Sequence, residues 1–309
     1  MNPLAIVALV VLGIGATSFV GALIEARAFL VRRVTVPVLE AGSEPIKVLH
    51  VSDIHFVPRQ RKKARWLQAL ARLEPHLVIN TGDNVAHPQA LAGIMSALSP
   101  LLDRPGVFVH GSNDYFVPRA RNPFAYLRGP TSESMSAAQL PADAMARAFV
   151  SQGWLDLNNA CAALIVNGTT LDFVGVDDPH IGRDVHPTPR PLPPLTRHIR
   201  IGVTHAPYAR NLGQFLKDGA AIVFAGHTHG GQVRLPLLGA LVTNCDLDRR
   251  QARGLHRWPL GSGKGAGGCW LHVSAGIGTS PYAPIRFFCR PEATLVELVS
   301  VQTEPEEIV

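Results

Sequence analysis

Apolar stretches alternate with amphipathic ones along most of the chain, and the first apolar stretch differs from all the others. From Leu4 to Ile24 the sequence contains no charged residue. A helix of this length can cross a hydrocarbon layer of roughly 30 Å. A soluble core helix would show a polar face, whereas this stretch offers only Thr17 and Ser18. The pattern predicts one transmembrane helix, within an anchor and flank that comprise residues 1–34.

A cleaved signal peptide is the alternative for this segment, because Ala26, Arg27 and Ala28 have the small-x-small form of a cleavage site. The sequence "MNP" lacks the basic residues that begin a signal peptide, which favours the anchor. Arg27, Arg32 and Arg33 follow the apolar run. By the positive-inside rule they place the next domain on the cytoplasmic face, with the exported side as the open alternative.

The chain as a whole has the composition of a folded protein, with 47% hydrophobic and 17% charged residues. Residues 35–45, "TVPVLEAGSEP", contain Gly and Pro and are predicted to form a linker. One domain then spans residues 46–301, and the acidic residues 302–309 form a tail. Residues 116–150 contain Pro and Gly breaks and are predicted to be an insertion, either a lid that contacts substrate or a plain surface excursion.

Five β-branched runs in this domain each end in polar residues that are able to bind metal. They are "IKVLHVSDIH", "HLVINTGDN", "GVFVHGSND", "HIRIGVTHAP" and "AAIVFAGHTH". Each run predicts a buried strand, and helical patterns such as "RKKARWLQALARLEP" and "PQALAGIMSALSPLL" lie between several of them. Strands that alternate with helices pair mainly in parallel, and such sheets bind ligands beyond the carboxyl ends of their strands. The side chains expected at that edge are Asp53, His55, Asp83, Asn113, Asp114, His205, His227 and His229.

The spacing and chemistry of these residues favour a centre with two metal ions. Asp53 and His55 are two positions apart, as are His227 and His229, so each pair can point to one side of an extended backbone. Without Asp114 the set contains seven oxygen and nitrogen donors, too many for one tetrahedral zinc. Two divalent ions that share a carboxylate suit this number and favour in-line displacement at phosphorus.

The order of the motifs D-x-H, G-D-N, G-S-N-D, T-H-A-P and G-H-T-H resembles that of the calcineurin-like metallophosphoesterase superfamily, over roughly residues 46–298. The resemblance implies an α/β fold, a four-layer α/β/β/α sandwich with two mixed sheets. It also implies phosphoester hydrolysis by a hydroxide that bridges two divalent ions. The assignments it implies are Asp53, His55 and His229 for one ion, Asn113, His205 and His227 for the other, and Asp83 as the shared ligand. Mn, Fe and Zn all suit these ligands.

The segments "GHTHGGQVRLP" and "GVDDPH", with the leading apolar run, are similar to the membrane-associated bacterial branch. That branch is often compared with UDP-diacylglucosamine hydrolases, which cleave a pyrophosphate on a lipid-linked sugar nucleotide. The resemblance implies an amphiphilic phosphorylated substrate. A broad phosphodiesterase is an alternative, as is a non-catalytic membrane-tethered platform, although a platform has no need of seven donors.

The basic surface has two interpretations. The net charge is +6, but basic residues interleaved with aromatic ones are lacking, so no nucleic acid partner is expected. The cluster "RQRKKAR", residues 59–65, is favoured as the solvated beginning of an amphipathic helix. The alternative is that it faces anionic lipid or substrate phosphate near the membrane.

The proton donor for the leaving group is the point at which the sequence departs from the family. The family has G-N-H after the third strand, and aligning Asn113 with that Asn places Asp114 at the His position. An ionised aspartate is a poor acid unless burial raises its pKa. His180, in "DDPH", is the other candidate donor, and an ordinary loop histidine is the plainer interpretation. The four scattered cysteines are expected to be buried thiols, with disulfides left open.

Overall fold

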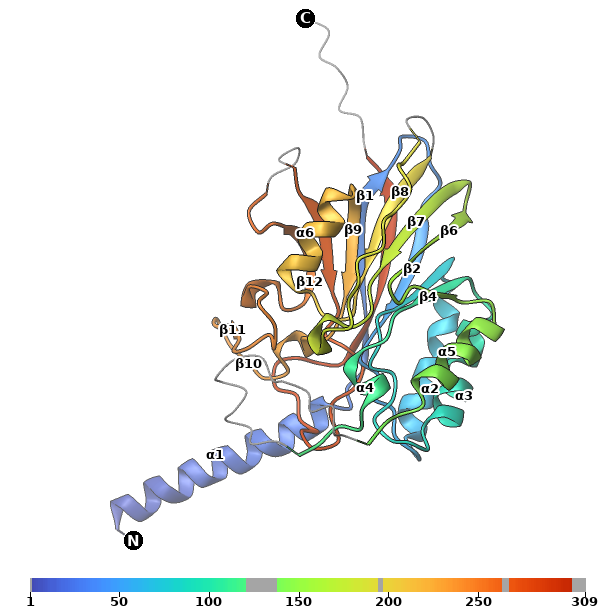
Figure 1. Ribbon diagram of the computed structural model, residues 1–309. Coiled ribbons are helices and arrows are strands. Elements are labelled where there is room, and N and C mark those ends of the chain that lie inside the picture. Colours follow the sequence, from blue (N-terminus) through green and yellow to red (C-terminus); the bar gives the residue numbers. More distant parts are fainter. Residues whose placement is uncertain (1, 121–137, 194–196, 263–266, 302–309) are drawn as a thin grey trace, which may run out of the picture.

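Two six-stranded sheets pack face to face between outer helices in the computed structural model, which describes residues 2–120, 138–193, 197–262 and 267–301. Helices α2, α3 and α5 cover one sheet and α6 covers the other (Figure 1). The helices are α1 (Pro3–Glu25), α2 (Arg61–Ala69), α3 (Leu91–Leu102), α4 (Ser112–Tyr115), α5 (Ala142–Ser151) and α6 (Ala209–Lys217). Short 3-10 turns are η1 (Leu70–Leu73), η3 (Pro179–Ile181), η4 (His229–Gly231) and η5 (Arg249–Gln251).

The first sheet has the strand order β1-β14-β2-β3-β4-β5. Its strands are β1 (Leu30–Leu39), β2 (Ile46–Val51), β3 (Leu77–Asn80), β4 (Gly106–Phe108), β5 (Leu155–Asp156) and β14 (Glu292–Ser300). Strands β2 to β5 pair in parallel, β14 is antiparallel to β2, and β1 is parallel to β14. The sheet is therefore mixed, and its parallel half carries the predicted strand-end motifs.

The second sheet has the order β12-β13-β9-β8-β7-β6. Its strands are β6 (Ala160–Val166), β7 (Thr169–Gly175), β8 (His198–Val203), β9 (Ala220–Ala225), β12 (Gly254–Trp258) and β13 (Cys269–Val273), and a separate hairpin pairs β10 (Arg234–Leu235) with β11 (Gly239–Ala240). Strands β7, β8, β9 and β13 are parallel, while β6 and β12 pair antiparallel at the two edges. Both sheets thus direct a set of parallel strands toward one edge.

Three hydrophobic clusters fill the spaces between the layers, and the alternation of side chains along each strand explains them. In β2, Leu49 and Val51 pack with helices α2, α3 and α5, whereas Ile46 and Val48 face the other sheet. A third cluster lies between the second sheet and α6, where Phe215 is fully buried. The predicted four-layer α/β/β/α arrangement with two mixed sheets is confirmed.

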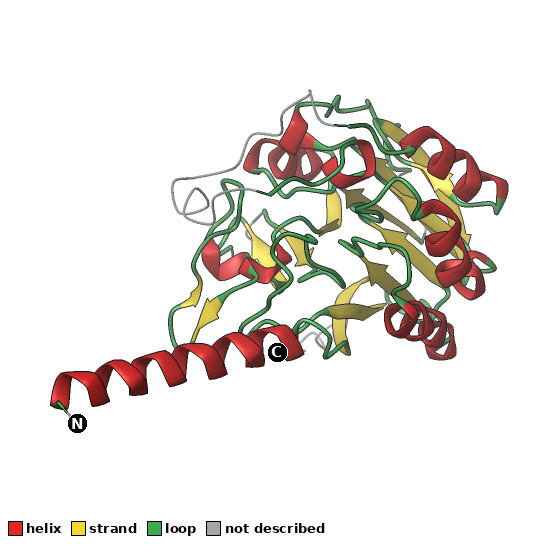
Figure 2. Ribbon diagram, turned by 90° about the horizontal axis from the view of Figure 1, so that it is seen from below, coloured by secondary structure: helices red, strands yellow, loops and turns green. Residues whose placement is uncertain are grey.

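Helix α1 projects away from the body of the molecule (Figures 1 and 2). It is the one helix in the described part of the chain that is long and apolar enough to cross a membrane, by length and composition. Its last turns contact the domain: Ala22 is buried and its carbonyl accepts a hydrogen bond from the Arg286 backbone N–H. The Glu25 carboxylate accepts hydrogen bonds from the backbone N–H groups of Phe288 and Cys289 at 3.0 and 2.6 Å.

The segments around the core differ in part from the sequence-based boundaries. The predicted linker, residues 35–45, begins inside β1, whose Val36 and Leu39 are fully buried. Much of the predicted insertion, residues 121–137, and the acidic tail, residues 302–309, lie outside the described residues. All four cysteines are free thiols, of which only Cys161 is exposed.

Candidate metal centre

Five loops that follow parallel strands meet at one edge of the sandwich, and they bring together all seven residues predicted to bind metal. The loops after β2, β3 and β4 come from the first sheet, and those after β8 and β9 come from the second. The residues that they supply are Asp53, His55, Asp83, Asn113, His205, His227 and His229. A hydrogen bond from the backbone N–H of His227 to the Asp53 carboxylate, at 3.1 Å, joins the two sheets here.

Four of these side chains form a compact group. Asp53, His55, Asp83 and His229 each offer a ligand atom, and the four atoms all lie within 4.8 Å of one another. The His55 Nε2 lies 3.4 Å from Asp83 Oδ2 and 3.1 Å from His229 Nε2. The His229 Nε2 lies 3.6 Å from Asp53 Oδ1. This is a spacing at which one cation can be bound by all four groups.

The other three residues lie around Asp83. The Asn113 Nδ2 donates to Asp83 Oδ2 at 2.8 Å, and its backbone N–H donates to Oδ1 at 2.7 Å. The His205 Nε2 lies 3.6 Å from Asp83 Oδ1, while its Nδ1 is fixed by the Thr81 carbonyl at 2.6 Å. The His227 ring lies 5.2 Å from the His205 ring, centroid to centroid. Asp83 therefore stands between two groups of donors.

The backbone at this edge adopts an uncommon conformation. Asp53, His55, Asp83, His227 and His229 all have positive φ, between 44° and 69°. This left-handed region costs non-glycine residues free energy, and such strain concentrates at functional sites. Five of the seven predicted ligands have this positive φ, which the intrinsic backbone preferences of Asp and His do not favour.

The glycine before the two histidines of "GHTH" is required by close packing. A Cβ on Gly226 would lie 1.9 Å from Ser52 Oγ and 2.6 Å from Asp53 Oδ2. The same Ser52 hydroxyl donates to Asp53 Oδ2 at 2.6 Å. Gly226 therefore allows the loop after β9 to approach the aspartate of the loop after β2.

The electrostatics of the group match the needs of a cation. Burial raises the pKa of Asp83 to about 8, and the neighbouring carboxylates of Asp53 and Asp114 add to the rise although His205 opposes it. Burial lowers the pKa of His55 to about 3, so its imidazole is neutral and able to bind metal. Two buried ring nitrogens, His55 Nδ1 and His205 Nε2, have no hydrogen-bond partner among the described residues. Burial works to lower the pKa of His205, but the carboxylates of Asp83, Asp178 and Asp53 outweigh it and raise the pKa to about 9, so a metal ion has to displace this proton. Closely spaced carboxylates and imidazoles of this kind fit divalent metal.

Asp114 is a buried hydrogen-bond acceptor, and this is at odds with its prediction as an acid. It accepts backbone N–H groups from Asp83 at 2.8 Å, Asn84 at 2.7 Å and Gly111 at 3.0 Å. Burial works to raise the pKa of Asp114, but the nearby charge of His110, whose Nδ1 lies 3.6 Å from Oδ2, and the N–H groups of Gly111 and Asn84 outweigh it and lower the pKa. A carboxylate held ionised has no proton to give. Its contacts instead position the backbone of Asp83.

His180 lies beside the group. It belongs to η3, its ring centroid lies 4.4 Å from that of His227, and its Nδ1 lies 3.1 Å from the hydroxyl of Tyr208. It is half-buried. This position keeps His180 as a candidate proton donor, because it borders the centre without being one of the seven donors.

Two cations behind the loops were not predicted from the sequence. The guanidinium of Arg286 is fully buried and donates to the carbonyls of Gly278 at 2.7 Å and Gly276 at 3.1 Å. Its Nη2 lies 3.3 Å from His229 Nδ1. The Lys63 ammonium donates to the Ile54 carbonyl at 2.7 Å, beside His55. Their burial could not be predicted from the local sequence, because neither "APIRFFCR" nor "RQRKKAR" contains a pattern that indicates a buried basic residue.

The chain is similar in sequence to several known proteins. The family model of the calcineurin-like phosphoesterases matches residues 46–231. The chain is 27% identical to the phosphodiesterase YaeI of Escherichia coli, and the match covers 84% of each chain. It is 26% identical to a bovine transmembrane protein with a metallophosphoesterase domain, over 70% of this chain and 48% of that protein. A solved phosphopantetheinyl hydrolase from Mycobacterium tuberculosis matches 85% of this chain and 98% of its own, with 12% identity and a TM-score of 0.42.

Proposed function

Because the chain belongs to the calcineurin-like phosphoesterase family, we propose that it is a membrane-anchored hydrolase that uses two divalent metal ions to cleave a phosphoester or pyrophosphate. The observation that carries the proposal is the group of Asp53, His55, Asp83 and His229, whose ligand atoms lie within 4.8 Å of one another. When bound, divalent ions supply Lewis-acid activation of a phosphoryl group and of water.

The residues of the chain divide into two sets around Asp83. Asp53, His55 and His229 hold one ion, and Asn113, His205 and His227 hold the other. The contacts of Asp83 with His55 on Oδ2 and with His205 on Oδ1 support its place between the two sets, since members of both sets lie against this carboxylate. The seven donors admit Mn, Fe or Zn, because no thiolate is among them.

Three groups outside the donor set complete the site. Asp114 fixes the backbone of Asp83 through their 2.8 Å hydrogen bond. Arg286 positions His229 from behind. Burial raises the pKa of Asp53, and the positive charge of Arg286 is one of the effects that oppose this rise. His180 donates a proton to the leaving oxygen, a role that its place beside His227 supports.

The substrate proposed for this centre is amphiphilic, such as a lipid-linked nucleotide sugar or a phospholipid. Helix α1 supports membrane attachment by its length and composition, and one relative is named as a transmembrane protein. Arg27, Arg32 and Arg33 after the helix favour the cytoplasmic face for the domain. Broad phosphodiesterase activity is the alternative that the name of the Escherichia coli relative supports.

A hydrolysis screen of the full-length protein in detergent tests the proposal. It compares nitrophenyl mono- and diesters, nucleotide-sugar lipids and phospholipids after chelation and after addition of Mn²⁺, Zn²⁺ or Fe²⁺. We expect activity to depend on metal and to fall at least about a hundredfold in Asp83→Asn, since even groups that only support a ligand cost 10–100-fold. The exposed Asp143→Asn on α5 is the matched control. Metal binding without hydrolysis of any substrate would instead identify a non-catalytic platform.

A further inference from the structure

A pocket of about 530 Å³ lies between the end of α1 and the start of α2, next to the candidate metal centre. Its lining is strongly basic, and none of the described residues that line it is acidic. The charged residues of the lining are Arg27, Arg59, Arg61, Lys62, Lys63 and Arg65. Arg27, Arg59, Arg61, Lys62 and Arg65 are exposed, and Lys63 is the buried lysine that binds the Ile54 carbonyl.

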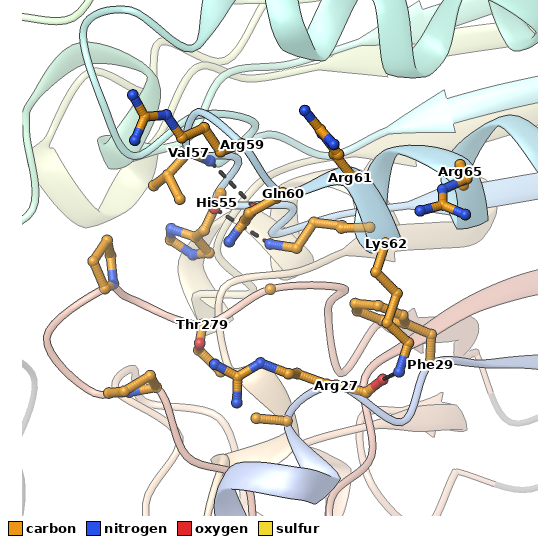
Figure 3. Close-up of a pocket in the computed structure, with 15 residues that line it drawn as sticks. Arg27, Phe29, His55, Val57, Arg59, Gln60, Arg61, Lys62, Arg65 and Thr279 are labelled. Carbon is orange, nitrogen blue, oxygen red and sulfur yellow. Dashed lines mark hydrogen bonds between the residues drawn. The ribbon is translucent and has the colours of Figure 1, made fainter.

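The centre of the pocket combines charge with neutral donors. Figure 3 shows the guanidinium of Arg27 beside Thr279, and the side chains of His55 and Gln60 next to each other across the pocket from it. Lys62 reaches from α2 to the chain after α1, where its ammonium donates to the Arg27 carbonyl at 3.0 Å. Arg59 and Arg61 point outward from this space. A hydrogen bond between α2 and the chain after α1 thus closes the inner part of the pocket, and Arg59 and Arg61 make its rim positively charged.

The pocket adjoins two other parts of the molecule, the candidate metal centre and the end of α1. His55 belongs to both the pocket and the candidate metal centre, where its Nε2 lies 3.4 Å from Asp83. Ala26 and Arg27 directly follow α1, so the pocket opens where that apolar helix ends. A molecule anchored in the same membrane as α1 would meet this pocket before the metal centre.

The chemistry of the lining selects for a phosphate group. Arginine and lysine side chains bind phosphate through charge-assisted hydrogen bonds, and several cations beside a hydroxyl and an amide, with no acidic residue among the described residues of the lining, favour an anion with several oxygens. Phe29, Val57, Pro281 and Pro284 add apolar walls, and the volume is within the range of small-molecule sites. We propose that this pocket binds a second phosphate group, distinct from the one that is hydrolysed, of a molecule at the membrane surface.

This inference rests on the proposed function, because the hydrolysed phosphate is assigned to the metal centre. The second phosphate has two sources: the substrate itself, as a diphosphate, or the headgroup of a neighbouring anionic lipid. Both present the same oxygens to Arg27 and Lys62. The experiment below has one arm for each source.

The experiment uses the full-length protein in phosphatidylcholine nanodiscs with Mn²⁺. The first arm compares bis-nitrophenyl phosphate, which carries one phosphate, with a nitrophenyl ester of a nucleoside diphosphate, which carries two. The second arm adds phosphatidylglycerol to the nanodiscs and follows the one-phosphate substrate. The variants are Lys62→Gln and Arg27→Gln/Lys62→Gln, and the control is Arg147→Gln, an exposed arginine on α5.

We expect the double variant to lower kcat/KM for the two-phosphate substrate at least about tenfold more than for the one-phosphate substrate, chiefly through KM. Alternatively, the stimulation by phosphatidylglycerol is lost in the double variant, which assigns the phosphate to lipid. Equal losses on both substrates with an unchanged lipid response, or the same losses in Arg147→Gln, would overturn the inference.

A binding measurement separates this inference from the proposed function. If the wild type hydrolyses neither substrate with any metal, the proposed function fails. The pocket is then tested with inorganic pyrophosphate on the chelated protein. Binding that weakens at least about tenfold in the double variant supports the pocket. A wild type that does not bind pyrophosphate, or a variant that binds it equally, refutes it.

Discussion

Replacing Asp114 by Asn tests whether this carboxylate supports the site or supplies a proton. Oδ2 of Asp114 accepts the backbone N–H groups of Asp83 and Gly111 and the side-chain amide of Asn84. Asparagine has one acceptor oxygen, so the variant turns an N–H donor toward other N–H donors. Two backbone hydrogen bonds to a charged acceptor are lost, each of which contributes about 1.5–3 kcal/mol, for a loss of about 3–6 kcal/mol in the free energy of unfolding.

The assay combines urea unfolding of the full-length protein in detergent with hydrolysis of nitrophenyl and alkyl phosphodiesters. We expect Asp114→Asn to lose stability and to slow both substrates by a similar factor, because the backbone of Asp83 moves. A general acid would behave differently, since its loss slows the alkyl ester far more than the nitrophenyl ester. An Asp114→Asn protein of wild-type stability with that selective loss would refute the reasoning.

Three further results are expected. His180→Ala should slow hydrolysis of alkyl esters by about a hundredfold and nitrophenyl esters much less, as loss of a proton donor predicts; equal rates in the wild type and the variant would exclude the role. His110 has a raised pKa because Asp114 outweighs the effect of burial. Its stabilising contribution is therefore complete below pH 6.5 and is lost as pH rises through its folded pKa. Urea unfolding at several pH values should show this fall in the free energy of unfolding in the wild type and not in His110→Asn, and a rise with pH would contradict it. Deletion of residues 1–20 should release the protein from membranes with little change in stability, whereas Glu25→Ala in the full-length protein should lower the free energy of unfolding by about 2 kcal/mol, because the two hydrogen bonds of half-exposed Glu25 are lost; a Glu25→Ala protein as stable as the wild type would show that these bonds contribute nothing.

Most of the fold could be predicted because the strand pattern and the strand-end residues are local features of the sequence. Runs such as "IKVLHV" and "AAIVFA" form β2 and β9 as expected. Strand β1 was missed, because Gly and Pro in "TVPVLEAGSEP" suggested a linker. Only pairing with β14, more than 250 residues later in the chain, makes residues 30–39 a strand of the first sheet.

The candidate site could be predicted in its members and less well in their roles. The seven candidate donors follow strands in the sequence, so their meeting at one edge of the sandwich could be predicted. Their binding of metal stays a prediction. The role of Asp114 could not be predicted, because its partners are backbone N–H groups that become neighbours only after folding. Arg286 was missed for the same reason: its contacts with His229 and the carbonyl of Gly276 form between distant loops.

Asp83 is proposed as the ligand that two ions share, and the metal content of the protein tests this assignment. The full-length protein is loaded with Mn²⁺, dialysed to equilibrium and analysed for bound metal beside Asp83→Asn and the surface control Asp143→Asn. We predict two ions per chain in the wild type and in the control, and a loss of tight binding at both sites in Asp83→Asn. A wild type that binds one ion or none, or an Asp83→Asn protein that retains two, would contradict the account.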